Sequence, residues 1–85
     1  MTVPAVQRTH EQEIIASAKN GSRHAYGELV SLFWEPTTGL VYHLYGDPAL
    51  AEEAAQEAFI RGWQKIGSFQ EERSFRSWIS RIAIN

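Results

Sequence analysis

The stretch Gly46-Asp-Pro-Ala-Leu-Ala-Glu-Glu-Ala-Ala-Gln-Glu-Ala-Phe-Ile-Arg-Gly-Trp63 decides the fold of this chain. Its first three residues indicate a boundary between two helices, because glycine ends a helix, aspartate caps the next one and proline fits a first turn. The helix that follows is expected to run to about Ile66, with Gly67 closing it. Its inward positions are small at the start and large at the end, so another helix can approach closely at one end. These positions are Ala51, Ala55, Ala58, Phe59, Gly62, Trp63 and Ile66.

A polar loop and a final helix are expected downstream, in residues 67–85. Apolar residues in this helix recur at i, i+3, i+4 and i+7, which is the side of a helix that packs inward. They are Phe75, Trp78, Ile79 and Ile82, whereas Arg76, Ser77, Ser80 and Arg81 point outward. Guanidinium groups and hydroxyls along one exposed face suit contacts to phosphates and unstacked bases. The alternative is a solvated polar face with no ligand, which is common for helices near a chain end.

Two more helices are expected upstream. Thr9 and Gln12 form a capping-box pattern, so a first helix begins near His10 and ends at Asn20-Gly21. Because no segment shows the alternating pattern of a strand, the sequence predicts an all-α domain, a small bundle of about four helices around one core.

The second helix is expected to begin after Ser22 as its N-cap. Its apolar stripe comprises Ala25, Tyr26, Leu29, Leu32 and Phe33, and resumes at Leu40, Val41 and Leu44. Between these two parts, Pro36 lacks a backbone donor and Gly39 adds backbone freedom. A kink or break is therefore expected between Glu35 and Gly39.

Length and composition limit the class of protein. The chain has 85 residues and no cysteine, which excludes disulfides, thiolate zinc sites and cysteine nucleophiles. No apolar run approaches the ~20 residues that cross a bilayer, and no signal-peptide layout is present, so no membrane insertion and a cytoplasmic location are expected. Residues 1–8 are expected to form a flexible tail, and residues 9–85 one helical domain.

Charge is distributed unevenly along the chain, although the formal net charge is only −2. Residues 47–60 contain four acidic and no basic residues, whereas residues 61–85 contain five basic and two acidic ones. An acidic block followed by a basic block indicates two surfaces for two different partners.

The acidic helix presents one compact ridge. Glu52 and Gln56 are spaced i, i+4, as are Glu53 and Glu57, so the four side chains share the face opposite the inward alanines. Such a run is usually a solvated face. The functional interpretation is a docking surface for a basic helix or coiled coil, in which complementary charge sets the rate and register of association.

Residue patterns for covalent or metal chemistry are lacking. His10, His24 and His43 have neither the i, i+4 spacing of a helical zinc pair nor the Glu-x-x-His spacing of a di-iron site. They are interpreted as surface or partly buried residues. We therefore expect no metal site, no cofactor and no enzymatic activity.

Three blocks of this chain together closely resemble the region 2 domain of bacterial RNA polymerase sigma factors of the extracytoplasmic-function (ECF) type. Asn20-Gly-Ser-Arg-His-Ala-Tyr-Gly-Glu-Leu29 is similar to the family's Gly-Asp-x-x-Ala-Phe-x-x-Leu opening. The stretch from Gly46 to Trp63 resembles its Gly-Asp…Ala-Glu-Asp…Gln-Glu-x-Phe…Trp helix. Residues 69–85 resemble its Phe-x-x-x-x-Ser-Phe-x-x-Trp-Leu-x-x-Ile-Ala-x-Asn ending.

The resemblance implies a module that recognises and melts promoters within the RNA polymerase holoenzyme in the bacterial cytoplasm. Glu52, Glu53, Gln56 and Glu57 would bind the clamp coiled coil of the polymerase β′ subunit. The loop would hold a base flipped out of the −10 promoter element, through Ser68, Gln70, Glu71, Glu72, Arg73 and Ser74. The non-template strand would be lined by Arg76, Ser80, Arg81 and Asn85.

The resemblance also implies a fragment. The chain ends at Asn85, inside the expected last helix, without the second domain (region 4) that reads the −35 element.

Phe69 and Phe75, which flank the loop, are expected to be core residues that hold it rigid, with Trp63 and Trp78 also in the core. The alternative function is a sigma-like interaction module that is bound by an anti-sigma factor and does not bind promoters.

Overall fold

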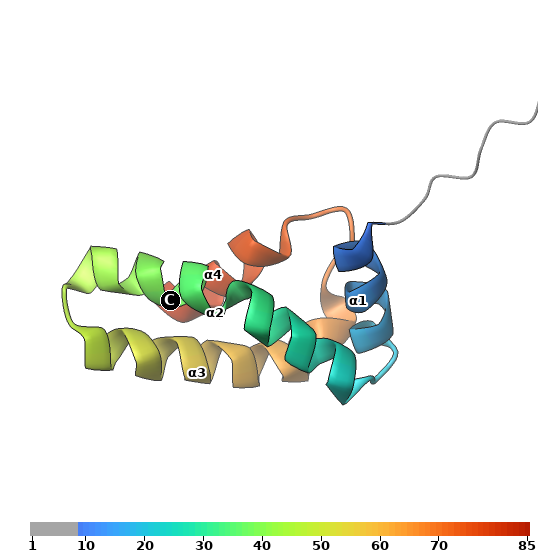
Figure 1. Cartoon of the computed structure of the whole chain (residues 1–85), viewed down its shortest axis with the longest axis horizontal. Helices are drawn as coiled ribbons and strands as arrows, with labels where there is room; N and C mark the ends of the chain where they lie inside the picture. The colour runs from blue at the N-terminus through green and yellow to red at the C-terminus, as the bar shows by residue number, and fades with distance from the viewer. Residues whose placement is uncertain (1–8) are drawn as a thin grey trace, which may run out of the picture.

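A computed structural model describes residues 9–85, so the tail expected at residues 1–8 lies outside the described residues. Four α-helices follow one another: α1 (His10–Lys19), α2 (Arg23–Tyr45), α3 (Pro48–Lys65) and α4 (Phe75–Ile84), with a short 3₁₀ helix η1 (Ile66–Ser68) after α3. Figure 1 shows α2 and α3 as a long antiparallel pair, with α1 at one end and α4 packed beside them. The predicted all-α bundle is confirmed, and residues 9–85 contain no strand.

Local capping sets most helix boundaries where the sequence predicts them. The Thr9 hydroxyl accepts a hydrogen bond from the Gln12 backbone N–H at 3.1 Å, and the Gln12 side chain accepts one from the Thr9 N–H at 2.8 Å. Gly46 ends α2 in the left-handed conformation with φ 70°, and the Asp47 carboxylate accepts the first free N–H groups of α3. These contacts satisfy backbone groups that have no partner within a helix.

Gly67 does not close α3, contrary to the sequence prediction. It lies inside η1, in which the Phe69 N–H donates to the Ile66 carbonyl at 3.1 Å and the Ser68 hydroxyl donates to the Lys65 carbonyl at 2.7 Å. Because the tighter turn and the serine supply these donors, α3 ends without a left-handed glycine.

Pro36 does not break α2, which is continuous from Arg23 to Tyr45. The helix does change direction, since Figure 1 shows its first half slanting and its second half running along α3. The Thr38 hydroxyl donates to the carbonyls of Trp34, at 3.0 Å, and Glu35, at 3.1 Å. Back-bonding of this kind often bends a helix. The inner face of α2, with Thr37 and Val41 buried, keeps the second half packed and helical despite the proline.

The core lies where α1, α3, α4 and the first half of α2 meet. Phe69 and Phe75 are 1% and 0% exposed, which confirms them as core residues. Trp63 and Trp78 are only half-buried and pack against the edge of this core. The fully buried part is completed by Ile14, Ile15, Ala18, Ala25, Tyr26, Leu29, Ala58, Phe59, Ile66 and Ile79.

Two leucines that the apolar stripe of α2 placed inside are instead exposed. Leu32 and Leu44 each retain 51% of their accessible surface. Leu32 lies beside the first residue of α1, because that ten-residue helix covers only the first turns of α2. Leu44 lies near the end of α2, where α3 is the remaining neighbour.

Candidate functional site

The loop between η1 and α4 is anchored at both ends by buried rings. The centroids of Phe69 and Phe75 lie 5.7 Å apart with nearly perpendicular planes, and Trp78 packs against both. Neither phenylalanine ring is available for stacking on a base, so the two rings fix the loop and do not contact a ligand. Buried aromatic pairs hold their neighbours in a defined geometry.

Hydrogen bonds then fix the course of the loop. The Arg73 N–H donates to the Gln70 carbonyl at 2.9 Å, which closes a turn, and the Ser74 hydroxyl accepts from the Ser77 N–H at 3.1 Å as the N-cap of α4. The polar loop residues surround this turn. Gln70, Glu72, Arg73 and Ser74 are exposed, Glu71 is half-buried, and Ser68 is exposed within η1.

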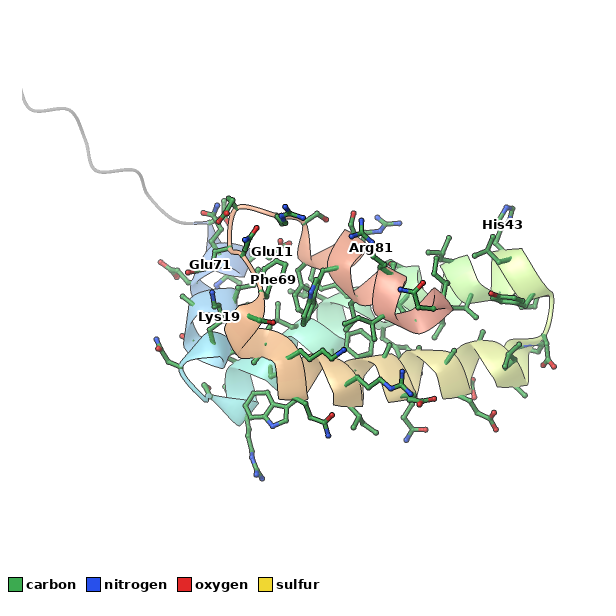
Figure 2. The ribbon with its side chains drawn as sticks, turned by 180° about the vertical axis from the view of Figure 1, so that it is seen from behind. Glu11, Lys19, His43, Phe69, Glu71 and Arg81 are labelled. Carbon is green, nitrogen blue, oxygen red and sulfur yellow. The ribbon has the colours of Figure 1, made fainter. Side chains whose placement is uncertain are left out.

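Lys19 of α1 contacts the loop, and the sequence analysis did not predict this contact. Its ammonium group donates to the Phe69 carbonyl at 2.6 Å and lies 3.9 Å from the Glu71 carboxylate. Figure 2 shows these three residues together at the end of the molecule formed by α1, with Glu11 of α1 nearby. A lysine in the last turn of a helix is ordinarily explained by the helix dipole, so the sequence carried no signal for this contact.

The outward face of α4 agrees with the predicted set in part. Arg76, Ser77 and Arg81 are exposed and Ser80 is half-buried, and Figure 2 shows Arg81 pointing away from α3. Asn85, the C-cap of α4, lines a small hollow of ≈ 100 Å³ together with Glu57 and Arg61 of α3. The structure therefore places Asn85 beside the acidic helix.

The acidic ridge is on the surface of α3, where the sequence placed it. Its members Glu52, Glu53, Gln56 and Glu57 are all exposed. The Arg61 guanidinium donates to the Glu57 carboxylate at 2.6 Å, in an i, i+4 pair that the spacing alone would have predicted. Among residues 9–85, Glu57 is the ridge residue with an ion pair, so the remaining negative charge of the ridge is concentrated toward the start of α3.

An apolar hollow of ≈ 360 Å³ borders the ridge, and it includes residues to which the sequence assigned no role. Trp34 and Val30 of α2 and Ile60 and Trp63 of α3 line it, and Gln56 of the ridge lies at its edge. Ile60 is 57% exposed. Partly exposed aromatic and aliphatic side chains that are bordered by polar groups are typical of a protein-binding surface.

Tyr26 forms the floor of this hollow and has a structural role. Its hydroxyl donates to the Phe59 carbonyl at 2.5 Å across the α2–α3 interface. Burial raises the pKa of the Tyr26 hydroxyl well above its usual value, because the charged form would lose its hydration. The group therefore stays protonated and serves as a hydrogen-bond donor.

The histidines lie on the surface, as expected. His24 and His10 lie 3.2 Å and 3.6 Å from the carboxylate of Glu28, and Figure 2 shows His43 at the opposite end of the molecule from Lys19. Among residues 9–85, no group of three or more metal-binding side chains has the arrangement of a metal site. In the same part of the chain, each helix is too short or too polar to span a bilayer.

Comparison with known families gives one match that covers more than half of the chain. Residues 35–85 match the family model described as sigma-70 region 2. The matched segment begins in the middle of α2 and contains α3, the loop and α4. It therefore includes every residue that the sequence analysis assigned to a binding surface.

Comparison with individual proteins gives relatives that are longer than this chain. The chain is 38% identical over 71 residues to the ECF RNA polymerase sigma factor SigW of Bacillus subtilis, an alignment covering 84% of this chain and 38% of that protein. It is 32% identical over 75 residues to the RNA polymerase sigma-H factor of Pseudomonas aeruginosa, covering 88% and 39%. The chain thus spans about two fifths of the length of these relatives.

A solved structure shares both the fold and the sequence pattern. It is the NMR structure of an engineered region 2 of sigmaE in complex with GTAAAA. The two structures superpose with a TM-score of 0.79 and are 28% identical, over 94% of this chain and 82% of the other.

Proposed function

Since the chain belongs to the sigma-70 region 2 family, as its resemblance to ECF sigma factors predicted, we propose that it acts in transcription initiation by recognising and melting the −10 element. In this role it docks on the β′ coiled coil of RNA polymerase in the bacterial cytoplasm. Sigma factors have no enzymatic activity of their own, so the expected absence of catalysis follows from family membership.

One observation carries this proposal. The engineered region 2 of sigmaE, whose structure was determined with GTAAAA, shares the fold of nearly the whole chain and more than a quarter of its residues. Similarity at this level in both fold and sequence supports a shared mode of nucleic-acid binding, which fold alone would not.

The loop and the outward face of α4 suit the two kinds of contact that single-stranded DNA offers. Arg76 and Arg81 are exposed cations on one helix, which favours phosphate contacts. The loop instead presents the exposed side chains of Gln70 and Glu72, whose oxygens accept hydrogen bonds from base amino groups, and the carboxylate of Glu72 repels phosphates. We propose that the loop binds the extruded base and that α4 binds the strand.

Base capture provides the free energy for strand opening. Unstacking a base costs on the order of a few kcal/mol, which binding of the extruded base and its strand offsets. A loop that is already fixed between two buried rings loses little conformational entropy when it binds.

The ridge on α3 and the hollow beside it together fit a helical partner. The ridge carries exposed carboxylates at Glu52 and Glu53, and the hollow offers Trp34 and Ile60. A coiled coil with basic and apolar side chains would complement both features. We propose that Glu52, Glu53, Gln56 and Glu57 contact the polymerase, with the hollow receiving an apolar side chain of the β′ subunit.

DNA binding is tested with single-stranded oligonucleotides selected by the chain from a randomised pool. Arg76→Ala and Arg81→Ala are each expected to weaken binding to all sequences and to reduce the slope of log affinity against log salt by about 0.7. Arg23→Ala, at the exposed start of α2, is the matched control and should leave the slope unchanged. A wild-type chain that selects no sequence contradicts base capture.

Polymerase docking is tested by pull-down with core RNA polymerase. Glu53→Lys is expected to abolish capture, whereas Glu13→Lys, the same change at an exposed position of α1, should leave it intact. Capture that survives Glu53→Lys contradicts the docking surface. A wild-type chain that binds an anti-sigma factor but neither polymerase nor DNA would favour the alternative of an interaction module.

A further inference from the structure

The contact between Lys19 and the loop joins two parts of the chain that are 50 positions apart. The Lys19 side chain is 24% exposed, and its ammonium group lies close enough to the Phe69 carbonyl for a strong, charge-assisted hydrogen bond. Phe69 is the last buried residue before the polar loop. The lysine therefore holds the backbone at the point where the loop leaves the core.

Lys19 acts on the loop at two neighbouring positions. Besides the Phe69 carbonyl, it attracts the Glu71 carboxylate at 3.9 Å, which draws that side chain toward α1. Glu71 is less exposed than its neighbours Gln70 and Glu72. Three contacts thus hold the loop: the buried ring of Phe69, the cap of α4 at Ser74, and Lys19 of α1.

The position of this loop matters for discrimination between bases. Hydrogen bonds to a base edge require donors and acceptors placed to within a fraction of an ångström, and a supporting contact sets that placement. We propose that Lys19 is a positioning residue that sets the sequence preference of the base-binding loop without touching DNA itself. This inference rests on the proposed function of the loop.

The test compares Lys19→Met with wild type in binding to the selected single-stranded oligonucleotide and to a scrambled one. Methionine keeps the length of the side chain and loses the donor and the charge. We expect the ratio of the two affinities to fall about tenfold, the size of effect that loss of one hydrogen bond to a charged group produces. Lys19→Arg, which restores a charged donor, should recover most of the ratio.

Lys65→Met is the matched control, because Lys65 is an exposed lysine at the end of α3 and its loss changes the net charge equally. Loss of a cation weakens binding to both oligonucleotides through the salt-dependent electrostatic part of the binding free energy. The ratio of affinities in Lys65→Met should therefore stay within about twofold of wild type. Amide hydrogen exchange is expected to increase at Phe69 and Arg73, whose N–H groups donate to the carbonyls of Ile66 and Gln70, in Lys19→Met, with α2 unchanged.

The outcomes separate the two levels of inference. A wild-type chain that selects no sequence overturns the proposed function and the role of Lys19 with it. A selective wild type with an equally selective and folded Lys19→Met overturns the role of Lys19 alone. If Lys19→Met does not fold, Lys19→Ala, which also lacks the donor and the charge, is measured for the same ratio, and an unchanged ratio again overturns the role.

Discussion

The two ends of this molecule are built differently. At the packed end, defined as α1, the first half of α2, the second half of α3, the loop and α4, four rings are buried: Tyr26, Phe59, Phe69 and Phe75. At the hairpin end, defined as residues 39–52, the buried side chains are Val41 and Ala51, and four large apolar side chains are exposed: Tyr42, Leu44, Tyr45 and Leu50. There α2 and α3 pack against each other, whereas α1 and α4 join them at the packed end (Figure 1).

The packed end meets the demand of the proposed base contact, and the docking surface makes a different demand. A loop that distinguishes bases needs a fixed backbone, and the packed end supplies it through buried rings, a helix cap and Lys19. A docking surface needs exposed charge and apolar area more than exact placement, and α3 supplies these along its outer face. Rigidity is therefore concentrated where sequence discrimination is proposed.

The largest expected effect is at the centre of the packed end. Phe75→Ala removes a ring that is 0% exposed and contacts the rings of Phe33, Phe69 and Trp78. We expect the free energy of unfolding to fall by about 3–5 kcal/mol, measured by urea denaturation. Tyr45→Ala, at the exposed hairpin end, should change it by less than about 0.5 kcal/mol. Similar losses at both positions would contradict the contrast between the ends.

Glycine-to-alanine substitutions at the two ends are expected to change the stability of the fold in opposite directions. A Cβ at Gly62 would lie 2.6 Å from the Tyr26 hydroxyl and 2.8 Å from a methyl group of Ile79, both buried and the former held by its hydrogen bond to Phe59. Gly62→Ala should therefore destabilise the fold by about 1–2 kcal/mol in thermal or urea unfolding.

The control for Gly62 is Gly39, which is also in a helix but has open space around its Cα. Gly39→Ala should stabilise the fold by about 0.5–1 kcal/mol, because alanine favours the helix. If Gly62→Ala also stabilised the protein, close packing of α3 against α2 and α4 would be refuted.

A substitution at Thr37, near the border between the two ends, is expected to change the free energy of unfolding by an intermediate amount. Its side chain is 0% exposed, and its hydroxyl has no hydrogen-bond partner in the described structure. Thr37→Val replaces the hydroxyl by a methyl group of similar shape, so the free energy of unfolding should rise by about 1 kcal/mol. Thr38→Val is the contrasting substitution, because it removes a hydroxyl that does make hydrogen bonds, and it should not stabilise the protein.

The smallest effect is expected on the exposed face of α3. Arg61→Ala removes the ion pair with Glu57, in which both side chains are more than half exposed. The expected loss of stability is about 0.3–0.5 kcal/mol and should shrink as salt is raised. A loss as large as that of Gly62→Ala would indicate that this exposed pair is as tightly structured as the core of the packed end.

Local signals in the sequence determined the helices, because capping and hydrophobic periodicity act within a few residues. The capping box at Thr9, the left-handed Gly46 and the inward face of α4 were all predicted and are present. The predictions failed where distant contacts intervene. Gly67 lies in a 3₁₀ turn completed by Ser68, and α2 continues through Pro36 because α3 packs against its inner face.

The sequence by itself thus determined the all-α fold, the family and the face of each helix that carries the charges. Only the tertiary structure decided which faces meet: Lys19 with the loop, Trp34 with Ile60 in one hollow, and Asn85 with Glu57. The physical reason is that crossing angles and helix lengths place such residues together. No pattern with a period of a few residues specifies those quantities.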